Sequence, residues 1–119
     1  MGYNVVVIPE SFHKFGKHDI EHVCVPIVIG GGSYDTSMEV VNGIDRVLKA
    51  EFQVKSVEEP EGDECTALYR RYTLKGEGGD LIVHVKLMGE NCGKIAGNRC
   101  SVLEFERDIY CIVKELANC

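Results

Sequence analysis

Apolar and polar residues alternate regularly in the segment "LIVHVKLM", residues 81–88. The apolar side chains fall two positions apart, and His84 and Lys86 occupy positions between them. Because successive side chains of a strand point to opposite faces, the pattern predicts an antiparallel strand with one buried and one solvated face. The residues expected on the buried face are Leu81, Val83, Val85 and Leu87.

A different period, of three and four residues, runs through "SMEVVNGIDRVLKAEF", from Ser37 to Phe52. This period is typical of a helix with one apolar face. Thr36 and Glu39 have the spacing of a capping box, in which two side chains satisfy amides at a helix start, so the helix is predicted to begin at Ser37. The apolar face, which we expect to cover a sheet, consists of Met38, Val41, Ile44, Leu48 and Phe52.

Shorter apolar runs between turn-forming residues predict further strands. These runs are residues 3–8, stopped by Pro9; 22–29, interrupted by Pro26; 52–59; and 66–74. The segment "KGEGGD", residues 75–80, predicts a hairpin turn before the strand at 81–88. Between the runs, we expect residues 10–21 to form a loop or a short helix and the glycine-rich residues 30–37 to be flexible.

The last part of the chain fits two interpretations. Residues 100–105 and 108–116 are predicted as strands, because Ile109, Tyr110, Ile112 and Val113 favour β-structure. The apolar spacing of residues 109–116 also fits a helix. With the strand interpretation, the chain is an α+β protein in which one long helix packs across a four- to five-stranded antiparallel sheet. We expect a single domain over residues 1–119, with residues 1–27 as an N-terminal extension or an extra edge strand.

The charge and the hydropathy of the chain argue against two classes of protein, those that bind nucleic acid and those that span a membrane. The net charge of −6 and the isoelectric point near 5.2 argue against nucleic acid as a partner, because phosphates require a basic surface. The longest apolar run, "VCVPIVIGG", is too short for a membrane span. The N-terminus lacks the pattern of a secretory signal, so the protein is expected to be intracellular or to have lost its signal.

The six cysteines leave three possibilities: disulfides, metal ligands or unrelated thiols. Zinc sites usually contain a C-x₂-C pair, and the chain has none, so His13, His18, His22 and Cys24 remain as the best metal set. Cys92 and Cys100 enclose "GKIAGNR", whose two glycines allow the chain to fold back into a disulfide. We favour the disulfide and expect no metal and no cofactor.

Catalytic motifs are missing from the sequence. His84 is expected to be a surface histidine beside Lys86, because no nucleophile is placed near it. The segment "VIGGGSYDTS" has neither a G-x-G-x-x-G nor a Gly-Lys-Ser/Thr pattern. We therefore do not expect an enzyme.

The order of these segments resembles the cystatin superfamily, including secreted cystatins and cathelin-like domains. The resemblance covers residues 28–119 and is carried by "GGGSYDTSMEVVNGIDRVL", "GEGGDLIVHVKLMGENC" and "CGKIAGNRCSVLEFERDIYC". It implies two disulfides, Cys92–Cys100 and Cys111–Cys119, and a secreted protein, with the cytoplasm as the alternative location. An extended Cys111–Cys119 loop would be strained, so Cys24 or Cys65 could instead pair with Cys119.

Cystatins inhibit papain-like cysteine proteases by inserting a glycine-containing N-terminal segment and a hairpin into the active-site cleft. The resemblance places this protease-binding site at Gly30, Gly31 and Gly32 and at Gly76, Glu77, Gly78 and Gly79. The Q-x-V-x-G hairpin motif is absent, and Glu77 places a charge where an apolar wedge is expected. We expect a protein-binding module, with protease inhibition as its most specific form. The alternatives are a non-inhibitory domain that binds another protein, or a cytosolic α+β protein with free thiols. The sequence does not define the oligomeric state.

Overall fold

The structure, a computed structural model, describes residues 2–11, 14–15, 18–19, 23–90, 98–100 and 105–117. Its helices are α1 (Tyr34–Glu51) and α2 (Phe105–Ala117). Its longer strands are β1 (Tyr3–Ser11), β5 (Ile27–Gly32), β6 (Val54–Glu58), β7 (Thr66–Lys75) and β8 (Asp80–Gly89). The short strands are β2 (Lys14–Phe15), β3 (His18–Asp19), β4 (Val23–Cys24) and β9 (Asn98–Cys100).

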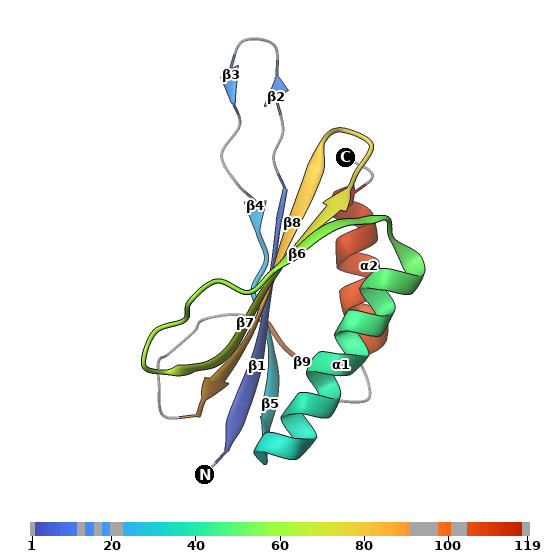
Figure 1. Cartoon of the computed structure of the whole chain (residues 1–119). Coiled ribbons are helices and arrows are strands. Elements are labelled where there is room, and N and C mark those ends of the chain that lie inside the picture. Colours follow the sequence, from blue (N-terminus) through green and yellow to red (C-terminus); the bar gives the residue numbers. More distant parts are fainter. Residues whose placement is uncertain are drawn as a thin grey trace.

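The main sheet has the strand order β6-β7-β8-β1-β5-β9, and β4 also pairs with β1. Neighbours among the five longer strands are antiparallel, whereas β9 lies parallel to β5. The predicted α+β class, with a long helix on a five-stranded antiparallel sheet, is confirmed. Strands β2 and β3 form a separate small hairpin that projects beyond the sheet (Figure 1), where the sequence predicted a loop or a helix.

The N-terminal segment is central to the sheet, so the prediction of an extension or an extra edge strand was wrong. Strand β1 lies between β8 and β5 and pairs with β8 along its whole length, from Tyr3 to Ser11. It continues through Pro9, where the sequence predicted a stop. Val5 and Val7 are buried beneath the helices, which explains why the segment is so apolar.

Both helices cover the same face of the sheet (Figure 1). Side chains from β1, β5, β7 and β8 share one core cluster with the buried face of α1 and with the buried residues of α2. The predicted alternation along β8 is confirmed, because all four of its predicted core residues are at most 1% exposed. On the predicted apolar face of α1, Val41, Ile44 and Leu48 are buried and Met38 is partly buried. Phe52 is also partly buried but is the C-cap of the helix, and Val40 is an additional buried residue.

Helix α1 begins three residues earlier than predicted. Its N-cap is Ser33, whose side-chain oxygen accepts a hydrogen bond from the backbone amide of Thr36 at 3.3 Å. The hydroxyl of Thr36 in turn donates to the carbonyl of Ser33 at 3.2 Å. Thr36 thus lies inside the first turn rather than at the cap.

The segment predicted as the last strand is a helix, α2. Ile109, Val113 and Ala117 are buried, one from each successive turn, and they pack against the core. The four-residue spacing of apolar side chains therefore outweighs the β-propensity of the individual residues. The strand predicted over residues 100–105 is confined, within the described residues, to β9, and α2 already begins at Phe105.

Candidate functional site

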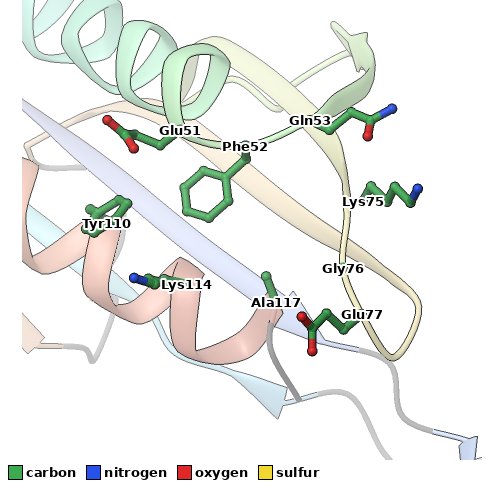
Figure 2. Close-up of a pocket in the computed structure, with 9 residues that line it drawn as sticks. All are labelled: Glu51, Phe52, Gln53, Lys75, Gly76, Glu77, Tyr110, Lys114 and Ala117. Atoms are coloured by element: carbon green, nitrogen blue, oxygen red, sulfur yellow. The ribbon is translucent and has the colours of Figure 1, made fainter.

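A cleft of about 530 Å³ lies where both helices end beside the turn between β7 and β8 (Figure 2). The end of α1 and the residues that follow it form one wall, the turn between β7 and β8 forms a second, and the last two turns of α2 form a third. The lining residues are Glu51, Phe52, Gln53, Lys75, Gly76, Glu77, Tyr110, Lys114 and Ala117.

Backbone hydrogen bonds hold the three walls together. The amide of Lys75 donates to the carbonyl of Gln53 at 2.9 Å, which joins the end of β7 to the segment after α1. The amide of Glu77 donates to the carbonyl of Ala117 at 2.8 Å, which joins the turn to the end of α2. Because these are main-chain bonds, the relative positions of the three walls do not depend on the conformation of side chains.

Glycine is required at two positions of the turn. A β-carbon on Gly76 would lie 2.5 Å from the carbonyl oxygen of Gly79 and 3.0 Å from that of Ala117. Gly79 has a φ of 142°, a conformation that residues with a side chain rarely adopt. Gly76 thus permits the close approach of the turn to α2, and Gly79 permits the turn itself.

The floor of the cleft is aromatic and its rim is charged. The rings of Phe52 and Tyr110 lie 5.9 Å apart, and Lys114 lies over the ring of Tyr110 at 5.5 Å. The rim carries Glu51, Lys75 and Glu77, which form no ion pair with any residue in the described part of the chain. Apolar surface beside a few polar groups is typical of a ligand site.

The structure does not bring together the two predicted protease-binding segments. Gly32 pairs with Tyr3, and Tyr3 also pairs with Gly89, so Gly30, Gly31 and Gly32 lie at one end of the sheet. The turn with Gly76, Glu77, Gly78 and Gly79 lies at the opposite end of β8. A strand of this length spans roughly 30 Å, so the two segments cannot form one wedge.

The glycine-rich segment is also not a flexible linker. Gly30, Gly31 and Gly32 are the last residues of β5, which pairs with β1. Gly31 lies beneath the carboxylate of Glu90, because a β-carbon there would be 2.7 Å from a carboxylate oxygen of that residue. Gly30 differs, since nothing lies within 4 Å of the place where its β-carbon would be.

On the sheet face away from the helices, His84 links three strands. Its Nε2 lies 3.1 Å from Oε1 of Glu10 on β1, and its Nδ1 lies 2.6 Å from the hydroxyl of Tyr69 on β7. The side chain of His84 is only 14% exposed, which corrects the prediction of a surface histidine. Since both ring nitrogens already have partners, the arrangement is typical of a structural link rather than of a catalytic base.

A second polar link lies under α1. The hydroxyl of Tyr72 donates to Oδ1 of Asp45 at 2.5 Å, and Nζ of Lys49 lies 3.1 Å from Oδ2. Burial opposes ionisation of Asp45, but the hydrogen bonds from Tyr72 and Lys49 outweigh it and lower the pKa of this carboxyl. Burial, followed by the bond to Asp45, raises the pKa of Tyr72. Asp45 therefore gives the hydroxyl of the fully buried Tyr72 a hydrogen-bond partner.

The cysteines give no support for the predicted disulfides within the described residues. Cys111 is exposed on α2 and has a free thiol, so its predicted pairing with Cys119 receives no support. Cys92 and Cys119 lie outside the described residues. Cys100 belongs to β9, Cys24 to β4, and Cys65 lies just before β7.

The predicted metal set is only partly within the described residues. His13 and His22 lie outside them, and His18 and Cys24 belong to β3 and β4. Among the described residues, no group of three or more potential ligands is arranged to hold a metal ion. No helix in the described ranges is long and apolar enough to cross a membrane.

Only one wall of the cleft contains residues that were predicted as site residues. The resemblance to cystatins implied Gly76 and Glu77 as site residues. Phe52 was assigned to the buried helix face, and Tyr110 and Lys114 to a strand. The helical spacing of residues 109–116 was the signal that could have placed Tyr110 and Lys114 on one helix.

Comparison with known proteins gives no family for this chain: no family model matches it, and no curated protein matches it.

Proposed function

We propose that this chain is a protein-binding module that does not act as an enzyme and that receives a segment of its partner in the cleft between α1, α2 and the β7–β8 turn. The observation that carries the proposal is a cleft that is held by main-chain bonds and has an aromatic floor, with rim charges that form no ion pair with the described residues. Tyrosine is one of the residues that most often dominate protein binding, and Tyr110 lies partly exposed in the cleft.

The resemblance to cystatins suggests a narrower version, inhibition of papain-like proteases. In this fold, such inhibition would use the turn at residues 76–79 without the glycines of β5, because the two lie at opposite ends of the sheet. A titration of papain with the protein tests this version. Inhibition that is lost when Gly78 is replaced by a bulky residue would support it, and no inhibition at micromolar protein would end it.

Selection of peptides from a random-sequence library tests the broader proposal. Peptides enriched on the wild-type protein should bind the Tyr110→Ala variant about tenfold or more weakly, because the floor of the cleft is lost. Tyr34→Ala is the matched control: Tyr34 is also a helical tyrosine with one aromatic neighbour, Tyr3, and it lies at the start of α1, far from the cleft. Binding to this control should be unchanged.

Two results would overturn the proposal. One is that no peptide is enriched at micromolar protein. The other is that the enriched peptides bind Tyr110→Ala as well as they bind the wild type, while circular dichroism shows that the variant is folded.

A further inference from the structure

The helix ends beside the cleft indicate which sign of charge a bound segment should carry. Helices α1 and α2 run in the same direction across the sheet, so both C-terminal ends face the cleft (Figure 1). The end of a helix carries a partial negative charge of about half a unit, because its last carbonyl groups have no partners within the helix. At the end of α2, the carbonyl of Ala117 accepts the amide of Glu77 from the turn. Two such ends therefore direct a negative potential at the same place.

The formal charges that line the cleft cancel one another, and one of them, Lys114, lies in the last turn of α2. Glu51 and Glu77 are balanced by Lys75 and Lys114 at the rim, so the helix ends decide the sign. Lys49, in the last turn of α1, is paired with Asp45 and is not free to neutralise the end of that helix. The whole chain has a net charge of −6, which also favours a basic partner at long range.

Resting on the proposed function above, we infer that the cleft binds a basic segment of another protein: an apolar side chain on the Phe52–Tyr110 floor, with an adjacent Lys or Arg directed at Glu51, Glu77 and the helix ends. The floor lies beside the rim groups, as Figure 2 shows, so one short segment can reach both. The flexible side chain of Lys75 at the rim can turn away toward solvent, whereas the backbone carbonyl groups of the helix ends cannot.

Two small molecules of similar shape test the sign of the charge. Phenylbutylamine and phenylbutyrate have the same apolar part, and they end in an ammonium and a carboxylate group, respectively. Each is titrated into isotope-labelled protein, and the backbone amide shifts of residues 51–53, 75–77 and 110–117 are followed by NMR. The amine should bind roughly fivefold more tightly than the acid, as expected for one partly exposed charge interaction.

A second experiment reverses the charge of the two glutamates at the rim. The double variant Glu51→Lys with Glu77→Lys should reverse the preference, so that the acid binds more tightly. The matched control is Glu39→Lys with Glu61→Lys, which changes the net charge equally at exposed positions outside the cleft. This control should retain the preference for the amine.

The outcomes separate the two proposals. If neither molecule shifts the amides of the cleft, both the binding site and its charge preference are wrong. If both molecules bind there equally, or the acid binds better, the basic partner is excluded and the cleft remains the binding site. If the control reverses the preference as the rim variant does, net charge rather than the cleft is responsible, and the inference also fails.

Discussion

At the scale of single residues, two tyrosines on the same strand have different roles. Tyr72 is fully buried and donates a hydrogen bond to the carboxylate of Asp45, whereas Tyr69 is half-buried and bonds to His84 on the opposite face. A hydrogen bond to a charged group contributes more to stability than one between neutral groups. We therefore expect the hydrogen bond of Tyr72 to contribute more to the stability of the protein than that of Tyr69.

Replacing Tyr72 with Phe tests this difference. The free energy of unfolding should fall by about 1–2 kcal/mol, because the carboxylate of Asp45 loses its buried donor. The matched change Tyr69→Phe should cost about 0.5–1 kcal/mol. Urea denaturation measures the free energy of unfolding of both variants. An equal loss in the two would contradict the larger contribution expected from Tyr72.

The lowered pKa of Asp45 predicts how stability depends on pH. Because the pKa is lower in the folded state than the ordinary 3.8, the contribution to stability is fully present above 3.8 and is lost as the pH falls from that value through the lower pKa of the folded state. The wild type should therefore lose more stability than Asp45→Asn between neutral pH and about pH 3. Denaturation curves at a series of pH values measure this, and parallel losses would show that Asp45 has no such role.

At the scale of elements, a direct test can show whether the segment of α2 is a helix or a strand. Ile109 is 1% exposed and Cys111 is exposed, although in a strand both would lie on the same face. Replacing Ile109 with Ala should lower the free energy of unfolding by about 2–4 kcal/mol, because it leaves a cavity in the core. Cys111→Ala should change it by less than about 0.5 kcal/mol. Similar losses at both positions would favour the strand.

The turn between β7 and β8 contains a glycine that the fold requires. Gly76→Ala should destabilise the protein by about 1–3 kcal/mol, because the new β-carbon would press against the carbonyls of Gly79 and Ala117. Gly30→Ala is the control, since its β-carbon meets open space, and it should be neutral within about 0.5 kcal/mol. Thermal unfolding compares the two, and a neutral Gly76→Ala would show that the turn does not contact α2 so closely.

These elements also show what the sequence could and could not reveal. Strand β8 and helix α1 were predictable, because each has a strong period and one buried face. Helix α2 was misjudged because individual β-formers were given more weight than their spacing. The position of Gly30, Gly31 and Gly32 was missed for another reason: three consecutive glycines suggest a linker, and only pairing with a distant strand orders them.

At the scale of the whole molecule, the topology creates the cleft. Strand β1 occupies the centre of the sheet, so β5 and β6 lie far apart and α1 must cross the sheet between them. Helix α2 then lies beside α1 and ends at the same side of the molecule (Figure 1). No local sequence pattern could have predicted the cleft, because its walls come from segments that meet only through this path.

The most direct measurement of the proposed function is amide hydrogen exchange, with and without a peptide selected on the wild-type protein. Binding in the cleft should slow exchange at residues 51–53, 75–77 and 110–117 and leave the end of β5, at Gly30, Gly31 and Gly32, unchanged. Protection at that end of β5, with no change around the cleft, would contradict the account.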